Sequence, residues 1–116
     1  MALNYLTDET FDPFVQKATQ PVVVFFHAPW CEDCSPIRDL VAQLAEEHPH
    51  LQFAEVDTEE AMEVAARFDI RGIPTLLVFE GGRMVDRLYS REARLPQNVE
   101  EFIASLAEGD TQTSVG

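Results

Sequence analysis

The chain has 116 residues and a formal net charge of −13 at pH 7, with 21 acidic residues against 8 basic ones. This length corresponds to a single domain, and with 46% hydrophobic residues the core needs no disulfide crosslink. The acidic balance argues against nucleic acids and anionic membranes as partners, because both require a basic patch. No segment approaches the roughly 20 apolar residues of a membrane-spanning helix.

The first elements predicted along the chain are a short strand, a helix and a buried strand. The strand covers 3–6, and the helix begins at Thr7, whose hydroxyl suits a helix cap. The apolar residues that follow recur at helical spacing and define a core face: Phe11, Phe14, Val15 and Ala18. Segment 22–27 is apolar at nearly every position, which predicts a strand buried on both faces.

The rest of the chain predicts three helices and three strands. The helices cover 32–47, 59–68 and 95–106, and the strands cover 51–57, 75–79 and 84–89. Gly81 and Gly82 join the last two strands as a hairpin turn. The order βαβαβαββα predicts an α/β fold with a mixed sheet and helices on both faces. We expect one domain over 1–107 and a disordered tail over 108–116.

The two cysteines of the chain, Cys31 and Cys34, have two residues between them and follow the buried strand at the start of a helix. A cysteine at a helix N-terminus faces unpaired backbone N–H groups, which favour its thiolate. Cys31 would therefore attack a partner disulfide, and Cys34 would resolve the mixed disulfide. A structural crosslink is the weaker interpretation for a protein of the reducing cytosol.

Zinc sites use the same cysteine spacing, so a metal site is the alternative. It would need two more ligands, and the candidates are His27, His48 and His50. The last two lie beyond the far end of the predicted helix, about 20 Å away. We therefore expect no metal, and no cofactor besides the redox-active cysteine pair.

Three segments together resemble the thioredoxin family: Phe26-His27-Ala28-Pro29-Trp30-Cys31-x-x-Cys34, Arg71-Gly72-Ile73-Pro74-Thr75, and Gly81-Gly82. The resemblance covers Leu3 to about Leu106 and implies the thioredoxin fold. It also implies that Pro74 is a cis proline beside the disulfide. The backbone of Ile73 would pair with an extended substrate peptide, and Trp30 and Pro74 would flank the sulfurs. The alternative is that Pro74 merely starts an edge strand.

The resemblance also implies a function and partners. The chain would be a protein-disulfide reductase that acts on disulfide-containing proteins and receives electrons from a thioredoxin reductase or a similar donor. We further expect a monomer, and a cytoplasmic location because the N-terminus resembles no signal peptide. The alternative function is a binding or chaperone-like module with weak redox activity.

The chain departs from the family between and before the cysteines. Glu32 and Asp33 stand where the family has Gly-Pro, and their carboxylates would disfavour the Cys31 thiolate and make the pair more reducing. Phe25 replaces a buried carboxylate that is thought to handle the proton of the resolving cysteine. His27 stands where the family prefers tryptophan, and it would either relay protons or simply fill space.

A further departure concerns substrate choice. Ser90 lies near the position of a family glycine that lines the docking groove, and Arg91 and Arg94 follow it. A side chain at that place would narrow the groove. The two arginines would either favour acidic partners or remain solvated loop residues.

Overall fold

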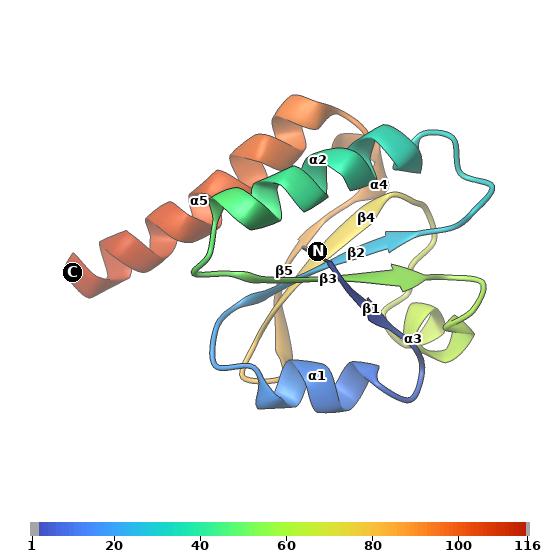
Figure 1. The fold of residues 1–116 in the computed structure, drawn as a ribbon, viewed down its shortest axis with the longest axis horizontal. Helices are drawn as coiled ribbons and strands as arrows, with labels where there is room; N and C mark the ends of the chain where they lie inside the picture. Colours follow the sequence, from blue (N-terminus) through green and yellow to red (C-terminus); the bar gives the residue numbers. More distant parts are fainter. Residues whose placement is uncertain (1–2, 116) are drawn as a thin grey trace.

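A computed structural model describes the backbone of residues 3–115 and the side chains of residues 3–106 (Figure 1). Its elements in chain order are β1 (Asn4–Leu6), α1 (Phe11–Lys17), β2 (Val22–His27), α2 (Cys34–Glu47), β3 (Gln52–Asp57), α3 (Met62–Arg67), β4 (Thr75–Glu80), β5 (Arg83–Leu88), α4 (Ser90–Ala93) and α5 (Pro96–Val115). The predicted strands and helices are all present, and α4 is an addition that the sequence did not predict.

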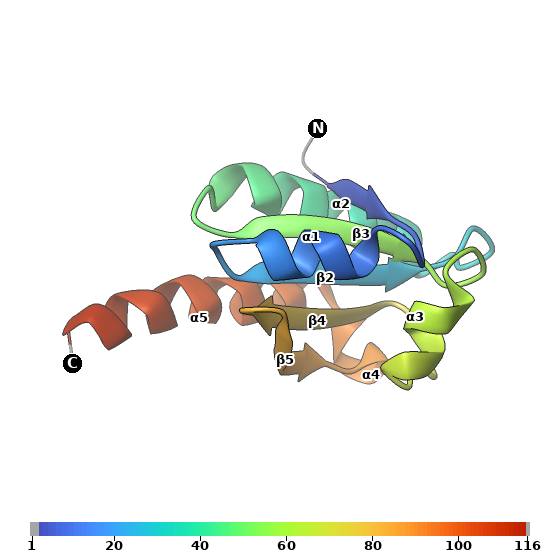
Figure 2. The same ribbon diagram turned by 90° about the horizontal axis from the view of Figure 1, so that it is seen from below.

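The five strands form one mixed sheet in the order β1-β3-β2-β4-β5. β2 lies at its centre, parallel to β3 and antiparallel to β4. Helices cover both faces, α1 and α3 on one and α2, α4 and α5 on the other (Figures 1 and 2). The predicted α/β fold with a mixed sheet is therefore confirmed.

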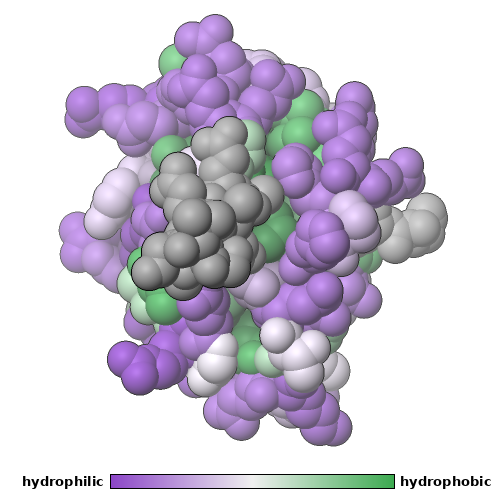
Figure 3. All heavy atoms as spheres, turned by 90° about the vertical axis from the view of Figure 1, so that its left-hand side faces the viewer, coloured by the Kyte–Doolittle hydropathy of each residue, from purple (hydrophilic) through white to green (hydrophobic). Residues whose placement is uncertain are grey.

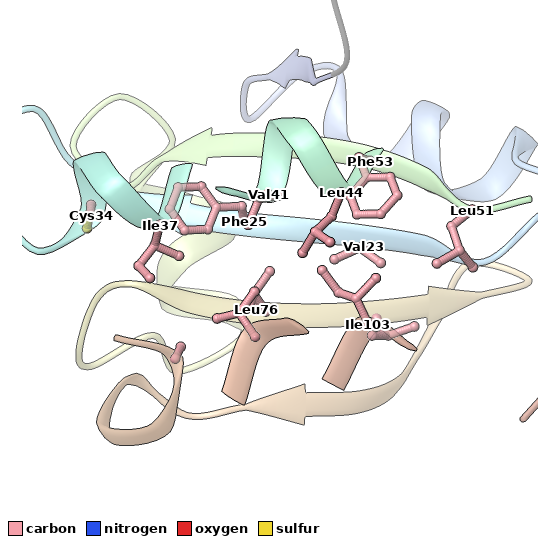
Figure 4. Close-up of a cluster of buried hydrophobic side chains, with 13 residues drawn as sticks. Val23, Phe25, Cys34, Ile37, Val41, Leu44, Leu51, Phe53, Leu76 and Ile103 are labelled. Atoms are coloured by element: carbon pink, nitrogen blue, oxygen red, sulfur yellow. The ribbon is translucent and has the colours of Figure 1, made fainter. Parts of the chain in front are cut away.

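Alternation along β2 divides the interior into two cores. Val24 and Phe26 pack with α1 and α3, whereas Val23 and Phe25 face α2 and α5. Solvent does not reach either core at β2, because every residue from Val22 to Phe26 is buried. The second core continues along α2 and contains the sulfur of Cys34 at one end (Figure 4).

The ends of two helices differ from the prediction. α1 begins at Phe11, not at Thr7. The hydroxyl of Thr7 instead accepts hydrogen bonds at 3.3 Å from the N–H groups of Glu9 and Thr10, which form a turn ahead of the helix. α2 begins at Cys34, two residues later than predicted.

The C-terminal helix is longer than predicted. The expected end was Leu106, but α5 continues to Val115, so the backbone of 108–115 is helical where the sequence predicted a disordered tail. Residue 116 of that tail lies outside the described residues. No proline follows Leu106, and one glycine costs a helix only about 1 kcal/mol. The domain boundary at 107 stays a prediction.

Figure 3 shows the molecule from the side on which α5 ends. The visible side chains on this side are mostly hydrophilic and surround small hydrophobic areas.

Candidate active site

The cysteine pair lies in the turn between β2 and α2. Cys31 and Cys34 form a disulfide with their Cα atoms 5.3 Å apart. The turn is closed by backbone hydrogen bonds from the Cys31 N–H to Ala28 at 3.1 Å and from the Cys34 N–H to the Cys31 carbonyl at 3.2 Å. Cys34 is the first residue of α2 and only 3% exposed, whereas Cys31 is partly exposed. A partner disulfide can therefore reach Cys31 but not Cys34.

The loop before β4 lies against the disulfide. The Ile73–Pro74 peptide bond is cis, as the resemblance implied, and the carbonyl oxygen of Ile73 is 4.0 Å from the Cys31 sulfur. Pro74 itself is buried, while Ile73 is partly exposed and Trp30 is 65% exposed. Of the three residues expected to contact a partner, Trp30 and Ile73 are therefore accessible and Pro74 is not, and their role in binding stays a prediction.

Two side chains that the sequence analysis did not single out hold this loop in place. The buried hydroxyl of Thr75 donates to the carbonyl of Gly72 at 2.6 Å. Arg87 on β5 donates to the carbonyls of Phe68 and Asp69 at 2.8 and 2.9 Å. Its guanidinium also lies over the ring of Tyr89, 4.9 Å from the centroid. The loop is therefore fixed to the sheet from both of its ends.

The two acidic residues between the cysteines are exposed. Asp33 occupies the cap position of α2, but its side chain makes no capping hydrogen bond. Both carboxylates therefore stay solvated beside Cys31, and their influence on the cysteine pair is limited to partly screened charge. The effect of Glu32 and Asp33 on the redox potential stays a prediction.

A buried ion cluster lies on the same face of the sheet as Cys34. Glu55 on β3 is directly opposite Phe25 in the register of β2 and β3, and it is 5% exposed. Its carboxylate binds Arg38 of α2 through two hydrogen bonds, at 2.8 and 2.9 Å. It also lies 3.0 Å from Nε2 of His27. His27, which the sequence singled out, thus has Glu55 and Arg38, which it did not, as neighbours.

The environment of Glu55 keeps its carboxylate ionised. Burial alone would raise its pKa, but the hydrogen bonds and positive charge of His27 and Arg38 outweigh burial and lower the pKa from 4.5 to about 2. Of the charged side chains that the structure describes, Glu55 is the one that is buried. The sequence offered one clue, a charged residue inside the otherwise apolar run 53–56.

The predicted groove residues lie on the short helix α4. A Cβ atom added at Gly72 would collide with the hydroxyl oxygen of Ser90 and lie 3.1 Å from its Cβ, so Ser90 packs directly over the loop that leads to Pro74. Arg91 and Arg94 are exposed on the same helix. An effect of Ser90 on a docking groove and a role of the arginines in partner choice both stay predictions.

The part of the chain that the structure describes holds neither a metal-binding group nor a membrane-spanning helix. No group of three or more His, Cys, Asp or Glu side chains in this part of the chain could hold a metal ion. None of the helices that the structure describes is both long and apolar enough to cross a membrane.

The sequence and the fold of this chain are similar to those of known proteins. The family model described as Thioredoxin matches residues 2–105. Thioredoxin 1 of Nostoc sp. is 35% identical over 105 residues, which cover 88% of this chain and 98% of that protein. Glutaredoxin 3 of Danio rerio is 40% identical over 81 residues, which cover 69% of this chain, but the chain spans only 25% of that protein's length. The X-ray structure of Fasciola hepatica thioredoxin superposes with a TM-score of 0.80 at 28% identity, covering 89% of this chain and 98% of that one.

Proposed function

This chain belongs to the thioredoxin family, its Cys31–Cys34 pair is that of a thiol–disulfide oxidoreductase domain, and we propose that it works as a reductase of protein disulfides. The observation that carries the proposal is the unequal exposure of the two sulfurs, Cys31 partly exposed and Cys34 buried. One sulfur can meet a partner, and the other can act only after the first has reacted.

The reaction follows from this arrangement. In the reduced protein the Cys31 thiolate attacks one sulfur of a partner disulfide, forming a mixed disulfide and releasing the other partner sulfur as a thiolate that takes up a proton. The Cys34 thiol then loses its proton and attacks the Cys31 sulfur. The mixed disulfide breaks, the second partner thiol leaves, and the Cys31–Cys34 disulfide forms. Two electrons pass to the partner, and a further reductant must return the pair to the dithiol.

The partner would dock beside the disulfide as an extended peptide. The backbone of Ile73 lies next to the Cys31 sulfur and can pair with an added strand. The exposed indole of Trp30 provides apolar contact on the other side. We propose an electron donor of the thioredoxin reductase class, a monomeric state and a reducing compartment such as the cytoplasm. Absence of other cysteines in the sequence supports the last point, because the fold needs no structural disulfide.

Two serine variants test the roles of the cysteines. With a disulfide-containing protein such as insulin, reduced Cys34→Ser is expected to accumulate a mixed disulfide through Cys31, detectable by mass spectrometry. Cys31→Ser is expected to form none and to lose turnover. Equal trapping by both variants would contradict the assignment.

The same assay separates the reductase from a binding module. A module would hold its partner equally well when both cysteines are serine, and its turnover would be negligible. The reduction potential of the pair adds a second criterion, which we expect at or below about −270 mV. A pair that stays dithiol under strongly oxidising conditions would contradict the proposed direction of the reaction.

A further inference from the structure

The ion cluster around Glu55 lies on the same face of the sheet as the resolving cysteine and contacts α2, the helix that begins with Cys34. We propose that His27 accepts the proton of Cys34 and that Glu55 positions His27 for this transfer. The inference rests on the proposed function, because it concerns the second step of the same reaction. Three observations carry it: the ionised carboxylate of Glu55, the place of the cluster on the Cys34 side of the sheet next to α2, and its poor fit to a purely structural role.

The protonation state follows from Glu55. A carboxylate whose pKa is lowered to about 2 stays ionised in neutral solution and can only accept hydrogen bonds. In the 3.0 Å contact, Nε2 of His27 must therefore be the donor. Whenever the ring is neutral, its single proton is therefore on Nε2, and Nδ1 keeps a lone pair that can accept a proton. Glu55 thus fixes the tautomer and stabilises the imidazolium that forms when Nδ1 accepts a proton.

The cluster lies beneath the first turns of α2. Arg38, which binds Glu55, comes one helical turn after Cys34 on the same face of the helix. The ring of His27 stacks on Phe25 with centroids 5.4 Å apart, and Phe25 and Cys34 belong to one buried cluster (Figure 4). The His27 side chain is 15% exposed, so water can reach the ring and carry the proton.

Packing of the sheet against α2 does not by itself require a carboxylate at position 55. A buried carboxylate must lose its hydration, so its ion pair is often no more stabilising than apolar residues of similar volume, although Arg38 itself stays 46% exposed. The buried side chains that β2 and β3 present to the opposite face are all apolar, so these strands can be packed without buried charge. Arg38 alone already satisfies both oxygens of Glu55, and the contact with His27 is additional.

In the proposed step, the Cys34 thiol gives its proton to Nδ1 of His27. The resulting thiolate attacks the Cys31 sulfur of the mixed disulfide, and the partner thiolate leaves. The imidazolium then returns the proton to the leaving sulfur or to water, so no oxidant or further reactant is required. The net transfer remains two electrons to the partner.

Other titratable groups lie beside this cluster on the neighbouring elements. Asp57 is opposite His27 in the register of β2 and β3. Tyr5 of β1 is opposite Glu55 and donates its hydroxyl to Glu60. Asp39 adds negative charge near Arg38. These groups stay unchanged in the variants below, so differences between variants report on Glu55, Arg38 and His27.

The test follows the two steps separately. One equivalent of the aromatic disulfide DTNB reacts with the reduced protein in two phases, each releasing one coloured thiolate: attack by Cys31, then resolution by Cys34. Stopped-flow absorbance gives the rate of each phase across pH. The variants are Glu55→Gln, Arg38→Met and His27→Asn. The control is Asp12→Asn, because Asp12 forms a similar two-bond pair with Arg67 on the opposite face, at 3.1 and 2.9 Å.

The proposal predicts opposite shifts from the two halves of one ion pair. Glu55→Gln removes negative charge beside His27, so the pH midpoint of the second phase falls and its rate at pH 7 drops about tenfold. Arg38→Met removes positive charge, so the midpoint rises. His27→Asn slows the second phase about 100-fold, in the range of a lost general base. In these variants the first phase keeps the pH midpoint of the parent protein. The Asp12→Asn control keeps the parent midpoint of the second phase.

Two results would overturn the inference. If Glu55→Gln and Arg38→Met move the midpoint in the same direction, or not at all, the cluster is structural. If His27→Asn leaves the second phase unchanged, another group takes the proton. Should Glu55→Gln fail to fold, Arg38→Met and His27→Asn decide the question alone. Failure of the proposed function is distinct, since the unaltered protein would then still show both phases with DTNB but no turnover with insulin.

Discussion

The two faces of the sheet are built from the same strands but differ in composition. The face covered by α1 and α3 is filled by aromatic and aliphatic side chains, with Phe11, Phe68 and Phe79 in mutual contact at centroid distances of 5.2–5.5 Å. The face covered by α2 also has an apolar core, but its end beside the active-site turn holds Cys34 and the Glu55 cluster. Adjacent positions of one strand, such as Phe25 and Phe26, therefore belong to different chemical environments.

This difference shows how a small domain can combine a stable fold with buried reactive groups. The apolar face contributes stability through area removed from water and close packing. The other face contains groups whose burial is unfavourable unless every charge has a partner. We therefore expect substitutions on the first face to change stability without changing the redox pair, and substitutions near Glu55 to change both.

The largest expected effect is on the apolar face. Phe79→Ala removes a side chain that is 1% exposed and contacts the rings of Phe11 and Phe68. It should lower the free energy of unfolding by about 4 kcal/mol, because a cavity remains where the ring was. Urea unfolding measures this loss, and the reduction potential of the folded variant should equal that of the parent. A changed potential would show that the two faces are coupled.

The next largest effect concerns Glu55 and depends on pH. Its folded pKa of about 2 lies below the unfolded value of 4.5, so it contributes stability above pH 4.5 that is lost as pH falls through 2. The shift corresponds to about 3 kcal/mol in neutral solution. Urea unfolding of the parent and of Glu55→Gln should therefore differ most at pH 7 and converge between pH 4.5 and 2.

Asp12→Asn is the comparison for this measurement as well. Asp12 and Arg67 are both about half exposed, so their pair is screened and contributes at most about 1 kcal/mol. A difference between parent and Glu55→Gln that stays constant down to pH 2 would contradict the assigned ionisation of Glu55.

The general fold was predictable because its signals are local. The apolar run Val22–Phe26, the Gly81-Gly82 turn and the helical spacing in 37–44 each indicate one element without knowledge of the rest. The cysteine motif and Pro74 then placed the active-site turn. By contrast, α4 has four residues, which is too short for an apolar period to be recognised.

The Glu55 cluster was not predictable for a different reason. Its partners lie 17 and 28 residues away along the chain, and neither Arg38 nor Glu55 belongs to a motif. From the sequence, the loss of a carboxylate at Phe25 left Cys34 without an evident base. The structure shows a carboxylate on the neighbouring strand, at the position paired with Phe25, which only the register of two strands could reveal.

A smaller effect is expected where α4 meets the loop before Pro74. Gly72→Ala should destabilise the protein by about 1–2 kcal/mol, because the new methyl group would collide with the Ser90 side chain. Ser90→Gly in the same chain removes both of the atoms it would meet and should restore most of the loss. Thermal unfolding of the two single variants and the double variant measures this coupling. Simple addition of the two single effects would contradict the contact.

The smallest expected effect comes from the exposed acids between the cysteines. Replacing Glu32 and Asp33 by Gln and Asn removes two solvated charges beside Cys31, which favours its thiolate and therefore the dithiol form. About 1 kcal/mol of screened interaction corresponds to a potential raised by about 20 mV, measurable by alkylation and mass spectrometry in dithiothreitol buffers. The matched control is Glu46→Gln with Glu47→Gln, which removes the same charge at the other end of α2, beyond the Debye length. An equal rise in both double variants would assign the effect to net charge, whereas a rise confined to the first would assign it to the two solvated carboxylates beside Cys31.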